Sequence, residues 1–228
     1  MRRLILMVVV YACALLPSRV VAETFNFDTG TPGLSTGQNA PFDQTSGVVT
    51  AHFSAPAGAG IYSIQTDAST GFTLTQFSGH YLYPNNPNRD LLDIKFTKPL
   101  SSITFTFATA DFPPIETPTP VVLTAYVDST GNPAVGSAIA QGVYNLTDTL
   151  PMGTLSFSSL PGQSFNLVEI GIQPGGGTGF LLDNITVTLV PEPSSLLMIL
   201  SGLLAAAFRP PTPSSLRPYP SIPSRQPA

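Results

Sequence analysis

The chain has 228 residues, of which 43% are hydrophobic and 10% are charged, and its apolar residues recur in short runs. These values exclude a chain that is disordered throughout and leave room for one domain of ordinary size. Between Glu23 and Val190, three basic residues stand against twelve acidic ones, which excludes a nucleic-acid partner because an acidic surface repels phosphates.

The first 22 residues have the three parts of a secretory signal peptide. Met1–Arg3 is basic, Leu4–Leu16 is an apolar run, and small or β-branched residues precede a cleavage site between Ala22 and Glu23. Two alternatives stay open: a lipoprotein cut before Cys13, and a membrane anchor, for which thirteen apolar residues are short against a hydrocarbon core of about 30 Å. Because Cys13 is the only cysteine, cleavage after Ala22 would leave a mature protein without disulfides.

Residues 23–189 carry the signals of β-strands and almost none of helices. Polar and apolar residues alternate in short stretches rich in β-branched and aromatic side chains, which is the pattern of half-buried strands. Turn residues separate these stretches, so we predict an all-β domain built as an antiparallel β-sandwich. The predicted strands are Thr24–Phe27, Val48–Phe53, Phe72–Phe77, Ile94–Thr97, Ile103–Phe107, Val121–Val127, Thr154–Phe157, Leu167–Ile172 and Leu181–Leu189.

Two stretches resemble extracellular jelly-roll domains. Asp93–Phe107 looks like their central paired strands, where a strand ending in proline leads to a buried strand, and Gly179–Val187 looks like their last strand. The resemblance implies a jelly-roll-like sandwich. It implies no particular activity, because this architecture hosts lectins, carbohydrate-binding modules and structural domains.

The same resemblance implies a candidate metal site. In such jelly rolls the first and last strands lie side by side, and a structural calcium can sit between their ends. Asp28 follows the first predicted strand and Asp183 lies in the last, and carboxylate oxygens suit calcium. The alternative is that Asp28 caps a turn and that Asp183 binds nearby backbone, in which case no cofactor is required.

The best ligand-binding candidate is a predicted loop between Gly79 and Asp90. Its polar and aromatic side chains are His80, Tyr81, Tyr83, Asn85, Asn86 and Arg89. Exposed tyrosine rings stack on sugars and the polar groups bind hydroxyls, so this loop favours a carbohydrate ligand. The competing interpretation is a structured hairpin whose tyrosines close the edge of the core.

Catalysis has little support in the sequence. His52 and His80 are the only histidines, and no metal-binding or nucleophile motif surrounds them. Acidic residues are numerous enough for a glycosidase pair, but sequence alone does not bring two of them together. We therefore expect that the protein is not an enzyme, with a secreted hydrolase as the remaining alternative.

A proline motif, an apolar stretch and a basic residue follow one another after the predicted domain. Pro191, Glu192 and Pro193 resist helix formation, the apolar run Leu196–Phe208 would reach about 20 Å as a helix, and Arg209 follows it. A basic residue at that end favours a cytoplasmic location. This order over 190–209 is similar to the PEP-CTERM sorting signal, and Pro191, Glu192 and Pro193 match its motif.

The resemblance implies that an exosortase-type enzyme processes the chain at the inner membrane. The protein would be exported, anchored transiently in the membrane by its short hydrophobic helix, and then placed at the cell surface or outside the cell. The sequence departs from the family after Arg209, because residues 210–228 form a Pro/Ser-rich tail for which we predict disorder. The first functional hypothesis is a non-catalytic surface or matrix protein, and the alternative is a surface module that binds polysaccharide.

Overall fold

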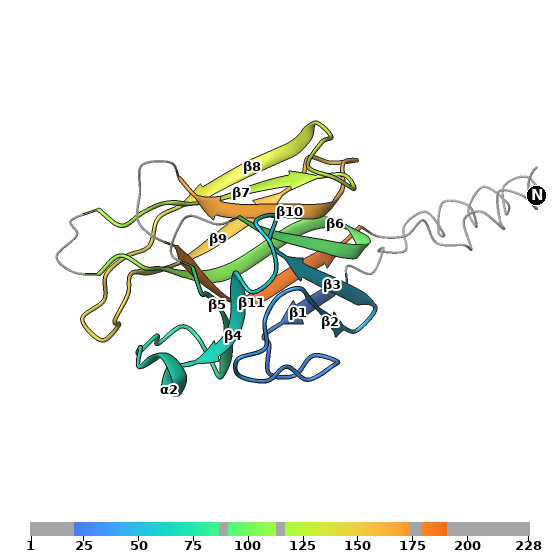
Figure 1. Cartoon of the computed structure of the whole chain (residues 1–228). Helices are drawn as coiled ribbons and strands as arrows, with labels where there is room; N and C mark the ends of the chain where they lie inside the picture. Colours follow the sequence, from blue (N-terminus) through green and yellow to red (C-terminus); the bar gives the residue numbers. More distant parts are fainter. Residues whose placement is uncertain (1–20, 87–90, 113–116, 174–178, 191–228) are drawn as a thin grey trace, which may run out of the picture. The chain divides into compact units, whose positions relative to one another are not determined.

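The computed structural model describes residues 21–86, 91–112, 117–173 and 179–190, and this part of the chain is almost entirely β-structure (Figure 1). The prediction of an antiparallel all-β sandwich is confirmed, since the paired strands run antiparallel throughout the described sheet. The strands are β1 (Ala22–Phe25), β2 (Phe42–Ser46), β3 (Val49–Ser54), β4 (Tyr62–Thr66), β5 (His80–Pro84), β6 (Leu92–Thr109), β7 (Val121–Tyr126), β8 (Ala134–Ala140), β9 (Met152–Ser158), β10 (Phe165–Ile172) and β11 (Phe180–Leu189), and the helix is α2 (Asp67–Thr70).

The long strand β6 belongs to both layers of the sandwich. Its first part, up to Phe96, pairs with β3 and β10, whereas its second part, from Leu100 to Thr109, pairs with β11 and β9. Pro99 lies between the two parts, where a residue without an N–H group interrupts a ladder at little cost. The sequence analysis predicted two strands here, and the structure joins them into one.

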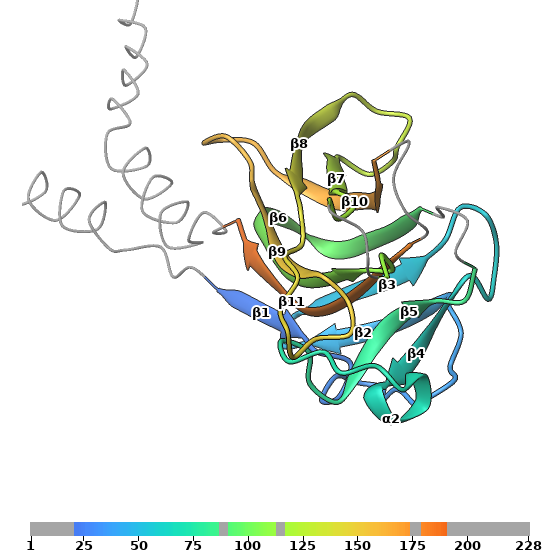
Figure 2. The ribbon, with the colours of Figure 1, turned by 90° about the vertical axis from the view of Figure 1, so that its left-hand side faces the viewer.

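We call the two layers A and B and define each by the strands that pair with β6. Layer A has the order β2-β3-β6-β10-β7-β8, with the first part of β6. In layer B the second part of β6 lies between β9 and β11, and the other edge of β11 pairs with β1 and β5, which in turn pairs with β4. Figure 2 shows β1 beside β11, so the first and last strands of the domain are neighbours.

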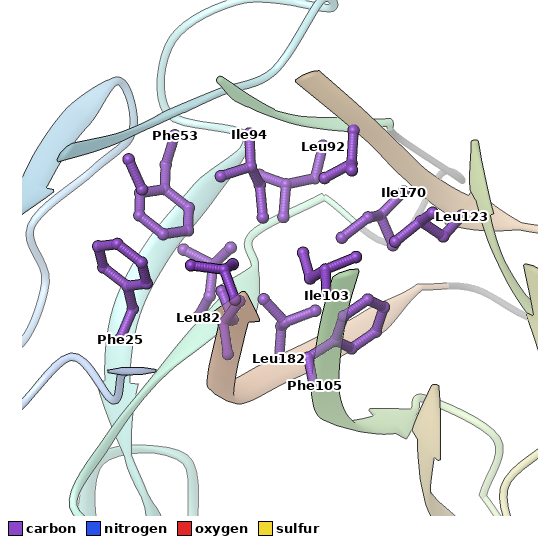
Figure 3. Packing of buried hydrophobic residues seen from close by; sticks show 14 of the residues in the cluster. Phe25, Phe53, Leu82, Leu92, Ile94, Ile103, Phe105, Leu123, Ile170 and Leu182 are labelled. Atoms are coloured by element: carbon purple, nitrogen blue, oxygen red, sulfur yellow. The ribbon is translucent and has the colours of Figure 1, made fainter. Parts of the chain in front are cut away.

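The core fills the space between the two layers. In Figure 3, Phe53, Leu92, Ile94, Leu123 and Ile170 of layer A face side chains of layer B. The facing side chains of layer B are Phe25, Leu82, Ile103, Phe105 and Leu182. All ten are at most 1% exposed, and they come from alternate positions of their strands, as a half-buried sheet requires.

Residues 72–77 differ from the prediction, because they form no strand. Thr66 caps α2, and Gly71 ends it with a left-handed φ of 74°. The chain then crosses the outer face of layer B, where Leu74 and the partly buried Phe72 and Phe77 pack in a second apolar cluster. The alternating apolar residues of this segment therefore cover a sheet and do not extend one.

Four strands escaped the sequence analysis: β2, β4, β5 and β8. Strand β8 consists mainly of small residues, and β5 is a short strand that ends at Pro84 beside two asparagines, a sequence that also suits a loop. Each pairs with a neighbouring strand, β8 with β7 and β5 with β4, and this pairing is not visible in their own sequences.

The predicted processing segments lie mostly outside the described residues. These are the signal peptide up to residue 20, the sorting motif with Pro191, Glu192, Pro193 and Arg209, and the tail 210–228. Ala22 and Glu23 are described and lie in β1, paired with Thr188 and Val187. Within the described ranges, no helix has the length and apolar character needed to cross a membrane.

Candidate functional site

The predicted ligand-binding loop is mainly the strand β5. Tyr81 is fully buried, and its hydroxyl lies 2.5 Å from Oγ1 of Thr70. Burial raises the pKa of Tyr81 to about 12. The ring is therefore part of the second apolar cluster and is not available for stacking on a ligand. The predicted loop would have left this ring exposed.

The polar side chains of this segment bind the protein itself. Nδ2 of Asn85 donates to the carbonyl of Gly60 at 2.9 Å, and Oδ1 of Asn85 accepts from Ser63 at 2.7 Å. Asn86 is partly buried and Arg89 lies outside the described residues. The structure thus does not place Asn85 and Tyr81 together in a binding site at the protein surface.

Tyr83 is the described tyrosine of the predicted ligand loop that stays partly accessible. Its ring centroid lies 6.3 Å from that of Phe72, which is 6.0 Å from that of Phe112. Phe112 is 51% exposed, and the loop that carries it begins at Asp111, whose carboxylate accepts from the N–H and the hydroxyl of Thr119. These three rings form an aromatic cluster at the edge of layer B.

Asp28, His80 and Asp183, which the sequence places far apart, meet where β1, β5 and β11 lie together. Oδ1 of Asp28 accepts from the backbone N–H of His80 at 2.9 Å and lies 2.8 Å from Nδ1 of its ring. The fully buried Asp183 accepts from the N–H groups of Ser78 and Asn184. The predicted proximity of the two aspartates is thus present in the structure.

At this junction the Asp28 carboxylate has the His80 ring as its partner, whereas the buried Asp183 carboxyl group has only hydrogen-bond donors in the described part of the chain. Burial raises the pKa of Asp183 to about 7, and the nearby Asp28 carboxylate adds to the increase. Within the described residues, no group of three or more histidine, cysteine or acidic side chains surrounds the pair. Two carboxylates would supply only part of the six to eight oxygen ligands of calcium, and carbonyl groups or water would have to supply the rest.

A row of polar side chains crosses the outer face of layer A. Strand register places one residue from each of five adjacent strands side by side on this face, and each of them carries a hydroxyl or a carboxyl group. The polar row consists of Ser54 on β3, Asp93 on β6, Glu169 on β10, Thr124 on β7 and Ser137 on β8. With about 4.8 Å between strands, the row is about 19 Å long.

Two carboxyl groups stand directly opposite each other at the centre of the polar row. Asp93 and Glu169 are register partners, so their Cβ atoms are about 5 Å apart. Burial raises the pKa of Asp93 to about 6, and the Glu169 carboxylate adds to the increase. Oδ1 of Asp93 is buried without a hydrogen bond. Like charges opposed across a sheet are unfavourable, and such perturbed acids cluster at functional sites.

A second row on the same face adds an aromatic ring and an apolar floor. Tyr126 on β7 is opposite Leu167 on β10, which is opposite Lys95 on β6 and then His52 on β3. Burial raises the pKa of Tyr126, and Glu169 raises it further, which places the phenol beside the polar row. The face therefore offers hydrogen-bonding groups in one line and the Tyr126 ring in the next, above the buried Leu167.

Sequence reasoning missed this face. The alternation around Asp93 predicts that its side chain points to solvent, but 76 positions separate it from Glu169 and nothing in either segment fixes their register. The pair lies on an open sheet. A pocket of about 280 Å³ lies elsewhere, and its lining of Ser101, Gln163, Val190 and their neighbours contains no carboxyl group.

No family model and no curated protein matches the sequence. Solved structures similar to this chain include adhesin and carbohydrate-binding domains. The K2 cleaved adhesin domain of Lys-gingipain is 13% identical with a TM-score of 0.44, over 74% of this chain and 100% of that one. A DUF4465 family protein from Bacteroides caccae is 14% identical with a TM-score of 0.45, over 75% and 100%. TmCBM61, solved with beta-1,4-galactotriose, is 8% identical with a TM-score of 0.38, over 61% and 88%.

Proposed function

We propose that the domain is a non-catalytic glycan-binding module of an exported surface protein, and that the outer face of layer A binds the glycan. The polar row carries this proposal. A sugar ring presents hydroxyl groups at its rim and C–H groups on its faces. A line of hydroxyl and carboxyl groups beside the Tyr126 ring can meet both kinds of surface at once.

The length of the polar row favours an extended chain of sugars over a single one. Its five groups come from five rigid strands, so their spacing is set by the sheet before a ligand arrives. Preorganised contacts lose little conformational entropy on binding, which favours affinity.

Affinity electrophoresis tests the proposal with residues 23–190 in gels that contain hydroxyethyl cellulose, soluble xylan, galactan or glucomannan. We expect at least one neutral polysaccharide to retard the protein, with bovine serum albumin as the non-binding reference. If none of these gels retards the domain between pH 5 and pH 8, the glycan-binding proposal is wrong. Release of reducing ends during the same incubation would instead support the hydrolase alternative.

Processing at both ends is a separate proposal, supported by the order of sequence segments. We expect the mature protein to begin at Glu23 and to end between Pro191 and Ser195, as a signal peptidase and an exosortase-type enzyme would leave it. Intact mass of protein recovered from the native cell surface or medium measures this. A recovered chain that still contains Leu196–Phe208 would contradict the sorting proposal.

We also propose that Asp28 and Asp183 bind a structural calcium ion, because a cation would offset the burial of the Asp183 carboxylate and its repulsion by Asp28, which raise the pKa of Asp183. At pH 7.5, 5 mM calcium chloride should raise the Tm over an EDTA control by on the order of 5 °C. Asp28→Asn should abolish the shift, whereas Asp67→Asn, at an exposed acid of α2, should keep it. An equal Tm in calcium and EDTA would rule the ion out.

A further inference from the structure

The carboxyl pair at the centre of the polar row is the least favourable arrangement on the outer face of layer A. Asp93 and Glu169 are direct register partners, and Oδ1 of Asp93 is buried without a hydrogen bond. A serine or threonine at either position would continue the hydroxyl pattern of the row without opposing charges. The fold therefore keeps two acids where local stability favours none.

The basic groups nearest to the pair are engaged elsewhere. Nζ of Lys95 donates to the carbonyl oxygen of Asp128 at 3.1 Å, and Nδ1 of His52 lies 2.5 Å from the Asp43 carboxylate. The other neighbours of the pair, from β3 and β7, are the neutral Ser54, Thr124 and Tyr126. In the part of the chain that the structure describes, no ion pair reaches Asp93 or Glu169.

We propose that the Asp93–Glu169 pair makes the polar row selective for uncharged glycans and takes up one proton when such a glycan binds. This inference rests on the proposed function of the face and specifies its ligand class. An anionic polysaccharide would bring a third negative charge to the pair. A neutral one meets two groups that both bind hydroxyls.

Proton uptake follows from the removal of water. A glycan that lies over the row displaces the solvent that screens the two carboxylates, so their repulsion and desolvation both increase. One proton removes the repulsion. The protonated carboxyl group then donates a hydrogen bond to a sugar hydroxyl, and the remaining carboxylate accepts one.

The direction of the pH dependence is fixed by this coupling. Burial already raises the pKa of Asp93 to about 6, and covering the row strengthens the same cause. The bound state then holds more protons than the free state, so affinity falls as pH rises above 6. A cationic ligand would do the opposite, because it binds best when both acids are ionised.

The test compares each neutral polysaccharide of the panel that binds with its own carboxymethylated form. Titration calorimetry of residues 23–190 at pH 6, 7 and 8, in two buffers of different ionisation enthalpy, gives affinity and proton uptake together. We expect about tenfold weaker binding at pH 8 than at pH 6, with uptake approaching one proton. We also expect at least tenfold weaker binding of the carboxymethylated form in low salt, a difference that narrows as salt is added.

Two variants assign the effect to the pair. Glu169→Gln should bind neutral glycan with a smaller pH dependence than the wild type, because the burial of Asp93 remains, and should discriminate less against the carboxymethylated form. Asp93→Asn removes the group that burial affects most and should bind with little pH dependence, and Asp67→Asn removes a distant charge as the matched control. Neutral glycan binding without proton uptake, or affinity that rises with pH, would overturn this inference and leave the proposed function standing. Absence of binding to every neutral polysaccharide would overturn both.

Discussion

Replacing Tyr126 with alanine is expected to weaken glycan binding about 30-fold, which corresponds to about 2 kcal/mol, the loss typical of a central tyrosine in a binding surface. The ring is a large rigid side chain on the outer face of layer A, and its neighbour Leu167 is only 6% exposed, so the ring is the main apolar group that this row offers to a ligand. Affinity electrophoresis or calorimetry with the polysaccharide that binds wild-type protein measures the change.

Tyr83→Ala is the matched control for Tyr126→Ala. It removes the same side chain from the aromatic cluster at the edge of layer B, where Tyr83 packs against Phe72. We expect less than a threefold change in affinity. If Tyr83→Ala loses binding and Tyr126→Ala does not, the ligand lies on the aromatic cluster, and the assignment to layer A fails.

Phe105→Ala should destabilise the domain by about 3–5 kcal/mol, the usual cost of removing a large aromatic side chain from a core. Phe105 is fully buried on the second part of β6, where Figure 3 shows it among the side chains of the core. Its ring centroid lies 6.5 Å from that of Phe107. Because a domain of this size is stable by only about 5–15 kcal/mol, this loss is a large share of the total. Urea unfolding of residues 23–190 measures it.

Phe112→Ala separates burial from side-chain identity. It deletes the same atoms at a position that is 51% exposed, so we expect a loss of at most about 1 kcal/mol. Equal losses for the two variants would mean that Phe105 contributes little by packing between the layers, and the two-layer description of the core would then be wrong.

Most of the fold prediction rested on the alternation of polar and apolar residues along the chain. It located the stretches that became β3, β6, β7, β9, β10 and β11, because each has β-branched or aromatic residues at alternate positions. Near α2 the alternation predicted one strand that is absent and missed one that is present. The apolar residues of 72–77 cover a sheet, whereas β5 owes its strand conformation to pairing with β4, which is a tertiary interaction.

The candidate sites show the same limit. Asp28 and Asp183 could be brought together in advance, because the resemblance to jelly rolls placed the first strand beside the last. Glu169 and Asp93 could not, because their proximity depends on the register of β10 against β6, and a shift of one residue would send every side chain to the opposite face. Register is set by the packed core, which no local pattern contains.

The passage of β6 through both layers has a mechanical consequence. If the outer face of layer A holds a glycan while the chain is anchored beyond Val190, tension runs from one layer to the other. Part of such a load crosses the van der Waals contacts between the two layers. The rest can follow the covalent backbone of β6, which pairs with β10 in layer A and with β11, the strand that leads to the anchor. Because Leu100 and Leu189 are register partners, pulling then loads the ladder between β6 and β11 at one end, so that its hydrogen bonds would open one after another.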